Sequence, residues 1–357
     1  MTTVRQQHPS RQGRALPCLL AGLALALALP LPANAQSPAP AAPVCEVSHK
    51  IVFAGLDWDS NAFHTALAQR ILRDGYGCTV DQLRGATIPL INGLARGEVH
   101  LVMEIWRSNQ PPAWTEGVAA GRLVELGVNY PDASQGWYVP RYLVQGDKAP
   151  APGLKSVADL PRYKALFKDP EEPGKGRFLN CIAGWQCELF NTKKLQAYGL
   201  NAHFTNFHPG SGAALDAAVL SAIKRKRPLL FYYWSPTWLM GQIGEELIKL
   251  DEPAYDAAKW QALSDLKDPA QARDATAYPV VEVVVGANQA FIAQAPKLRA
   301  FLQNYRTSGQ RVSEALAYMQ REQASADQAA VHFLKSQPKL WRSWVPADVA
   351  RHVQAGL

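Results

Sequence analysis

The sequence predicts an α/β protein of two lobes, each built on a mostly parallel sheet that is flanked by helices. Short apolar runs alternate with helical patterns in the first third of the chain, in the order strand, helix, strand, helix, strand, which predicts a parallel sheet. Further strands and helices are expected in the middle third. An apolar strand at 280–285 then follows. We therefore expect the middle third to be inserted into a first lobe that the C-terminal third completes.

The first lobe is expected to begin at residue 45 and to alternate strands with helices. Apolar residues recur every fourth position on one face of its first helix, and Gly75 and Gly77 end that helix. The expected elements are strands at 50–56, from 78 and at 99–106, and helices at 61–74 and 88–96.

The chain is expected to cross between the lobes twice. An extended segment at 136–144 leads into Pro-rich residues and predicts the first crossing, and the strand at 280–285 predicts the return. The expected parts are 45–136 and 280–357 for the first lobe and 137–279 for the second.

The second lobe has strand and helix patterns of its own. We expect strands at 176–179 and 229–233, with helices from about Glu188 and Ala213. The last segment of the chain is predicted to be helical, because Ser325 and Gln328 have the spacing of a capping box.

The first 35 residues have the pattern of a cleavable export signal. Three arginines precede an apolar run at 16–29 that is too short to span a bilayer comfortably, and a small-residue cleavage site at 33–35 follows. A membrane anchor is the alternative interpretation. Residues 36–44 predict a flexible leader because they are rich in Pro and Ala. The sequence thus predicts an exported protein of the periplasm.

Composition and motifs argue against several classes of function. The formal net charge of +7 falls to about +4 when the signal is removed, and no basic block remains, so a nucleic-acid partner has little support. The usual hydrolase, dinucleotide, zinc-protease and P-loop motifs are absent. His203 and His208, the closest histidine pair, lack the spacing of a helical metal site. We expect no enzyme activity, cofactor or metal, although a catalytic triad of residues distant in sequence remains an alternative.

Four cysteines remain after the signal, and their even number in an oxidising compartment predicts two disulfides. Cys181 and Cys187 are close in sequence and form the natural local pair. Cys45 and Cys78 are then left to pair, and both precede predicted neighbouring strands.

Several tryptophans stand where strands stop and polar residues, Gly or Pro begin. Trp58 and Trp106 follow or end strands of the first lobe, Trp234 ends a strand of the second, and Trp185 lies between two cysteines. Parallel-sheet proteins bind ligands at such strand ends. Core packing is the default interpretation of any single tryptophan, and it is our interpretation of Trp114, Trp260, Trp341 and Trp344. Indole faces that share a cleft suit a quaternary ammonium cation.

Charged groups of a ligand also have candidate partners. The segment from Trp185 to Cys187 precedes a helix, and free N–H groups at a helix start attract an anion. Glu104 lies two residues before Trp106 and therefore faces the same side of its strand. Its carboxylate could pair with a cation or oppose a ligand carboxylate, and Asp57 and Asp59 are similarly ambiguous. A solvated strand end is the alternative for these acids.

These motifs together resemble the glycine betaine/proline betaine/choline-binding proteins of osmoprotectant ABC importers, over about residues 46–350. The family's Trp-x-Pro pattern is similar to Trp234-Ser235-Pro236, with Trp238 in its second aromatic position. Its Asn-x-x-Gly-Trp-x-Cys-Glu pattern resembles Asn180 to Glu188, where Asn180 is followed directly by Cys181 and Gly184 to Glu188 line up. Trp106 resembles the family's strand-end tryptophan, and Trp58 an aromatic residue of the choline-binding branch.

The resemblance implies a type II periplasmic binding-protein fold, in which two lobes joined by two hinge crossings close over a ligand. It implies a monomer that passes the ligand to a permease and its ATPase and performs no chemistry. A carbohydrate-binding transport protein and an exported hydrolase are the rival interpretations. The expected ligand-binding residues are Trp58, Glu104, Trp106, Trp137, Tyr138, Trp185, Gln186, Cys187, Trp234 and Trp238.

Overall fold

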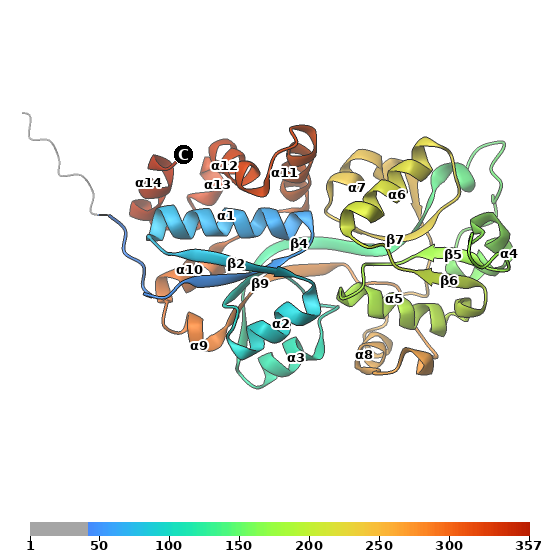
Figure 1. Cartoon of the computed structure of the whole chain (residues 1–357), viewed down its shortest axis with the longest axis horizontal. Coiled ribbons are helices and arrows are strands. Elements are labelled where there is room, and N and C mark those ends of the chain that lie inside the picture. Colours follow the sequence, from blue (N-terminus) through green and yellow to red (C-terminus); the bar gives the residue numbers. More distant parts are fainter. Residues whose placement is uncertain (1–41) are drawn as a thin grey trace, which may run out of the picture. The chain divides into compact units, whose positions relative to one another are not determined.

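A mixed sheet of nine strands runs through the part of the chain that the computed structural model describes, residues 42–357 (Figure 1). Its strand order is β2-β1-β3-β9-β4-β7-β5-β6, and β8 pairs with β4 at the side. The expected export signal and most of the leader lie outside the described residues. Within 42–357 no helix is both long and apolar enough to cross a membrane.

The first lobe begins with the alternation that the sequence predicts. Its parallel strands are β1 (Ile51–Leu56), β2 (Val80–Gly85) and β3 (Leu101–Trp106). The helices between them are α1 (Asp59–Tyr76) and α2 (Thr87–Arg96). Gly77 ends α1 in the left-handed conformation, with φ of 69°, which glycine adopts without a steric penalty.

The sheet is less parallel than expected, because its two long strands, β4 and β9, are antiparallel to the strands beside them. β9 (Val281–Asn288) is antiparallel to both β3 and β4 (Leu123–Pro140). The sequence indicated only the last part of β4, since Gly127 and Pro131 interrupt its apolar pattern. Several register shifts between β4 and β9 accommodate these residues.

β4 connects the two halves of the sheet. Residues 123–133 of this strand pair with β9, and residues 134–138 pair with β7 (Leu230–Ser235). β4 is therefore shared by both halves, and it carries the chain from the strands of the first to those of the second (Figure 1).

The second half repeats the three-strand arrangement. β5 (Gly176–Leu179) lies between β6 (Phe204–Phe207) and β7 and is parallel to both, and β8 (Leu247–Lys249) adds to β4. Its helices are α4 (Leu160–Tyr163), α5 (Gln186–Ala197), α6 (Gly212–Lys224), α7 (Trp238–Ile243) and α8 (Ala257–Asp265).

Helices cover both faces of the first lobe's strands. α1 and the last four helices, α11 to α14, lie on one face, and α2 and α3 (Pro112–Ala119) lie on the other (Figure 1). The C-terminal helices are α9 (Gln289–Ile292), α10 (Pro296–Asn304), α11 (Gly309–Arg321), α12 (Ala326–Ser336), α13 (Pro338–Trp341) and α14 (Ala347–Ala355). The capping box that the sequence predicts for α12 is present.

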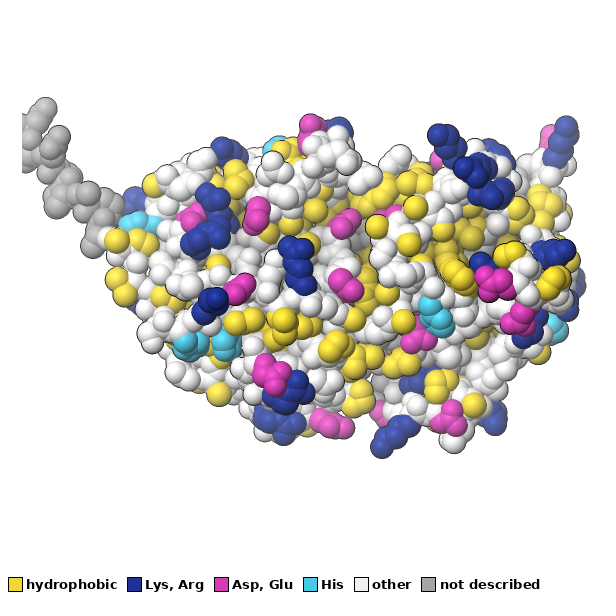
Figure 2. Space-filling view, viewed as in Figure 1, with side chains coloured by type: hydrophobic (Ala, Val, Ile, Leu, Met, Phe, Trp, Pro, Cys, Tyr) yellow, Lys and Arg dark blue, Asp and Glu magenta, His cyan; other side chains and the backbone are white. Residues whose placement is uncertain are grey.

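Disulfides join the cysteine pairs that the sequence predicts. Cys45 bonds to Cys78, with their Cα atoms 4.7 Å apart, and ties the segment before β1 to the segment before β2. Cys181 bonds to Cys187, with Cα atoms 5.9 Å apart, and closes the loop between β5 and α5. Basic and acidic side chains are interspersed on the face shown in Figure 2, in keeping with the mild net charge.

Candidate functional site

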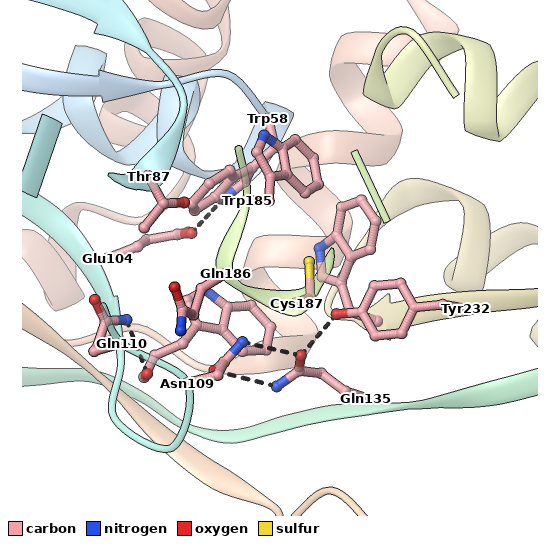
Figure 3. A pocket seen from close by; sticks show the side chains of 12 residues that line it. Trp58, Thr87, Glu104, Asn109, Gln110, Gln135, Trp185, Gln186, Cys187 and Tyr232 are labelled. Carbon is pink, nitrogen blue, oxygen red and sulfur yellow. Dashed lines mark hydrogen bonds between the residues drawn. The ribbon is translucent and has the colours of Figure 1, made fainter. Parts of the chain in front are cut away.

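Four tryptophans from four separate segments line one cavity (Figure 3). Trp58 lies between β1 and α1, Trp106 ends β3, Trp185 precedes α5, and Trp234 lies near the end of β7. The empty space among the lining residues is about 420 Å³, part of which is open to solvent. The structure therefore brings together the four strand-end and loop tryptophans that the sequence singles out.

Three of these indoles form a continuous edge-to-face series. The ring centroids of Trp58 and Trp185 are 5.1 Å apart with an interplanar angle of 69°, and those of Trp185 and Trp234 are 5.4 Å apart at 80°. Trp234 also stacks on Tyr233 at 4.7 Å. Edge-to-face contacts of this kind stabilise ring orientation. The rings are thus held in place by one another before any ligand is considered.

Glu104 lies on the same cavity, as its position two residues before Trp106 predicts. Its Oε2 accepts hydrogen bonds from the Trp58 indole at 2.6 Å and from the Ser60 hydroxyl at 3.2 Å. Burial raises the pKa of the Glu104 carboxyl, and the hydrogen bonds from Trp58 and Ser60 offset part of that rise.

A buried histidine lies behind Glu104. The Nε2 of His64 is 3.8 Å from Glu104 Oε1, and its Nδ1 lies 2.7 Å from the Tyr305 hydroxyl. Burial lowers the pKa of His64 to about 3, so this imidazole is neutral at physiological pH. Burial also raises the pKa values of Tyr130 and Tyr305 well above the usual tyrosine value. Glu104 therefore has no charged partner among these neighbours.

The remaining cavity wall is polar and was missed by sequence reasoning. Gln135 Oε1 accepts from the Tyr232 hydroxyl at 2.7 Å and from the Asn109 amide at 3.3 Å (Figure 3). Gln110 donates from Nε2 to the Trp106 carbonyl oxygen at 2.9 Å. Thr87, at the start of α2, completes the wall.

Sequence signals existed for some of these residues. Tyr232 lies two residues before Trp234 on a strand and therefore shares its face. Asn109 and Gln110 follow Trp106 directly in the next loop. Gln135 had no such signal, because it reaches the cavity through its antiparallel pairing opposite Trp234.

The N-terminus of α5 presents backbone donors at the cavity. Trp185 caps this helix without a side-chain bond, and Gln186 and Cys187 line the cavity beside it. Their backbone N–H groups have no backbone acceptor within residues 42–357. Gly184 has a φ of 90°, and its carbonyl oxygen accepts from Ile88 N–H at 3.3 Å. This contact holds the N-terminus of α5 against α2 of the first lobe.

Three expected site residues are placed elsewhere. Trp137 is completely buried in the core of the second half, where its indole donates to Asn191 at 2.8 Å and its ring packs on Phe178. Tyr138 packs against Phe231 and does not line the cavity. Trp238 lines a neighbouring cavity. Trp137 shares a face of β4 with Gln135 but lies two residues further along the strand, where it bonds to Asn191 of α5, and Tyr138 points to the opposite face.

That neighbouring cavity is acidic and shares two walls with the first. Trp58 and Trp234 line both, and Asp57, Asp59 and Asp216 line only the second. Asp57 accepts a hydrogen bond of 2.5 Å from the Trp185 indole. Burial raises the pKa of Asp216 to about 6. Asp57 therefore positions the Trp185 indole, and Asp59 lines the neighbouring acidic cavity.

Two lobes that share a mixed sheet and contribute opposite walls to an aromatic cavity define a two-lobed ligand-binding protein of the type II class. Residues 49–336 match the OpuAC family model, described as the substrate binding domain of ABC-type glycine betaine transport system. This match covers well over half of the chain. The chain therefore belongs to that family, whose members are substrate-binding proteins of transport systems.

Named relatives agree with this assignment. The chain is 27% identical over 249 residues to the glycine betaine/proline betaine-binding periplasmic protein of Escherichia coli K12, covering 68% of this chain and 72% of the relative. It is 29% identical over 163 residues to a trimethylamine N-oxide-binding protein of Pelagibacter ubique, covering 45% and 50%.

Solved structures show the same fold. A glycine betaine/L-proline-binding protein from Borrelia burgdorferi has a TM-score of 0.65 at 17% identity, covering 85% of this chain and all of that one. A choline binding protein in complex with choline has a TM-score of 0.64 at 17% identity, covering 86% and 97%. At such identities the likeness supports the fold alone.

Proposed function

We propose that this protein is the periplasmic substrate-binding component of an ABC importer and that it binds a quaternary ammonium compound: glycine betaine, proline betaine or choline. The observation that carries the proposal is the convergence of Trp58, Trp106, Trp185 and Trp234 on one cavity. A trimethylammonium group is weakly hydrated and permanently charged. It therefore gains more from the negative faces of indoles than it loses on leaving water.

The polar end of such a ligand has a matching site. The backbone N–H groups of Gln186 and Cys187 at the start of α5 lie beside the tryptophans and can donate to a ligand oxygen, favoured by the helix dipole. The proposed binding mode thus places the ammonium group among the indoles and the oxygen at the helix N-terminus.

The required affinity is within reach of so small a ligand. About eight heavy atoms at a ceiling near 1.5 kcal/mol per atom allow roughly 12 kcal/mol. Micromolar binding needs only about 8 kcal/mol. Three or four desolvated cation–π contacts of about 1–2 kcal/mol each supply much of that free energy.

Transport requires the two lobes to open and close. We propose that 45–136 with 280–357 forms one lobe and 137–279 the other, since β4 and β9 run between them. The protein would act as a monomer that delivers its ligand to a membrane permease and its ATPase. The export signal proposed at 1–35 would place it in the periplasm, where the Escherichia coli relative is named as residing.

Two rival functions predict different chemistry. A carbohydrate-binding protein would surround stacked indoles with many hydroxyl partners. An exported hydrolase would place a nucleophile and a base in the same cavity. Three polar residues of the cavity wall, Asn109, Gln135 and Tyr232, instead bond to one another.

Calorimetric titration of the purified mature protein tests the proposal. The panel contains glycine betaine, proline betaine, choline, carnitine and several sugars, and proton NMR follows each ligand during prolonged incubation. We expect saturable binding of at least one ammonium compound, recovered unchanged, and no heat from sugars. Binding of a sugar alone, or conversion of a bound ligand, would contradict the proposal.

A further inference from the structure

Glu104 is the only acidic or basic side chain among the described residues that line the tryptophan cavity. It is 1% exposed, and its Oε1 has no hydrogen-bond partner within residues 42–357. His64, the basic group behind it, is neutral and lies 3.8 Å away. An ionised carboxylate at this position therefore has no cationic partner among the described residues. A ligand with a net positive charge would neutralise it, whereas a zwitterion would bring a second carboxylate into the same enclosed space.

A second residue of the cavity, Gln110, also has an acceptor oxygen to which no group donates a hydrogen bond among the described residues. The Gln110 side chain is 6% exposed, and its amide orientation is set because Nε2 donates to the Trp106 carbonyl oxygen. Its Oε1 is left without a hydrogen-bond partner among the described residues. A buried acceptor in this state favours a ligand that supplies a hydrogen. The Oε1 of Gln186 also lacks a partner, but no hydrogen bond within residues 42–357 fixes the orientation of that amide, so it is weaker evidence.

The chemistry of the ligand's polar end decides whether a compound can supply a hydrogen to Gln110 without adding a negative charge near Glu104. A betaine carboxylate offers only acceptor oxygens, so it can bind the α5 N–H groups but cannot satisfy Gln110. A hydroxyl group offers one donor and two acceptor positions. A hydroxyl group can therefore accept from a backbone N–H as a carboxylate does, and it also supplies the kind of hydrogen that Gln110 Oε1 lacks.

We propose that Glu104 and Gln110 make this cavity selective for a quaternary ammonium alcohol, of which choline is the simplest, over a zwitterionic betaine. The inference rests on the proposed function, because it assumes that the tryptophans hold an ammonium group. Glu104 recognises the net charge of the ligand, and Gln110 recognises its hydroxyl hydrogen. The four tryptophans bind the quaternary ammonium group, which both ligand classes contain.

The wild-type protein provides the first test, because it does not depend on any variant folding. Calorimetric titrations at pH 8 compare choline, glycine betaine and ethyltrimethylammonium, which has the charge of choline without its hydroxyl group. We expect choline to bind at least tenfold more tightly than either of the others. Glycine betaine binding as tightly as choline would overturn the selectivity while leaving the proposed function intact. A protein that binds none of the three would overturn the selectivity, and one that also fails to bind proline betaine would overturn the proposed function as well.

Variants then assign the selectivity to its residues. Glu104→Gln keeps the shape and removes the charge, so choline and ethyltrimethylammonium should each lose at least tenfold in affinity, whereas glycine betaine should hold or gain. Gln110→Met keeps the length and removes the acceptor, so choline should fall to the affinity of ethyltrimethylammonium, which should not change. An equal loss for all three ligands in either variant would mark a purely structural role and overturn the assignment.

Discussion

Replacing Trp234 by alanine should weaken ligand binding about a hundredfold. Trp234 is 8% exposed, lines the cavity, and contacts Trp185 edge to face at 5.4 Å. Loss of one desolvated cation–π face costs about 2 kcal/mol. Loss of the aromatic contact that holds Trp185 costs about 1 kcal/mol more. Together these terms amount to roughly two powers of ten in the dissociation constant.

The Trp234→Phe variant distinguishes the loss of an aromatic face from a weakening of its negative potential. Trp234→Phe keeps an aromatic face of weaker negative potential, so we expect a loss of about 1 kcal/mol, or five- to tenfold. Calorimetry measures both affinities, and circular dichroism checks that each variant is folded, because truncating a buried tryptophan typically costs 3–5 kcal/mol of stability.

A matched control comes from the same segment. Trp238 is 7% exposed, so it is buried to nearly the same degree, but it lines the neighbouring acidic cavity and not the tryptophan cavity. Trp238→Phe should therefore leave ligand affinity within about twofold of wild type. A folded Trp234→Ala protein that binds normally would refute the aromatic-cage reasoning, as would equal losses from the two phenylalanine variants.

Three further predictions follow from single contacts. Because burial raises the pKa of Glu104 and a cation needs its ionised form, choline affinity should fall as pH is lowered through that raised pKa and level off above it; calorimetry showing no change would place Glu104 out of reach of the ligand. Asp57→Ala removes the acceptor of the Trp185 indole and should cost about 1 kcal/mol of binding, which Asp57→Asn should largely restore. Replacing Cys45 and Cys78 by alanine should lower the free energy of unfolding by up to about 4 kcal/mol in denaturant titrations, whereas unchanged stability would contradict the chain-entropy estimate.

Much of the fold could be predicted because local patterns carry it. The strand-helix alternation from β1 to β3 is set by apolar runs, glycine stops and parallel pairing, and the structure confirms it within a few residues. The first half of β4 could not be predicted. Gly127 and Pro131 break its pattern, and pairing with β9, far away in the sequence, sustains the strand.

Some site residues could likewise be predicted from local patterns, and others could not. Trp106 and Glu104 could be placed on one side because they are two residues apart on a strand. Gln135 could not, since its place is decided by register against β7. Trp137 was also expected in the site, but it lies two residues beyond Gln135 on β4, where its ring packs into the core beside Phe178.

The tryptophan cavity is proposed to recognise the positive charge of its ligand, and one pair of ligands tests this property directly. Choline and its neutral carbon isostere, in which a tert-butyl group replaces trimethylammonium, have the same shape and the same hydroxyl group and differ in charge. Calorimetric titration of the wild-type protein should show saturable choline binding and an affinity for the isostere at least a hundredfold weaker, since each cation–π contact is worth about 1–2 kcal/mol. Equal affinities would show that the cavity binds by shape and apolar contact alone, and would contradict the account.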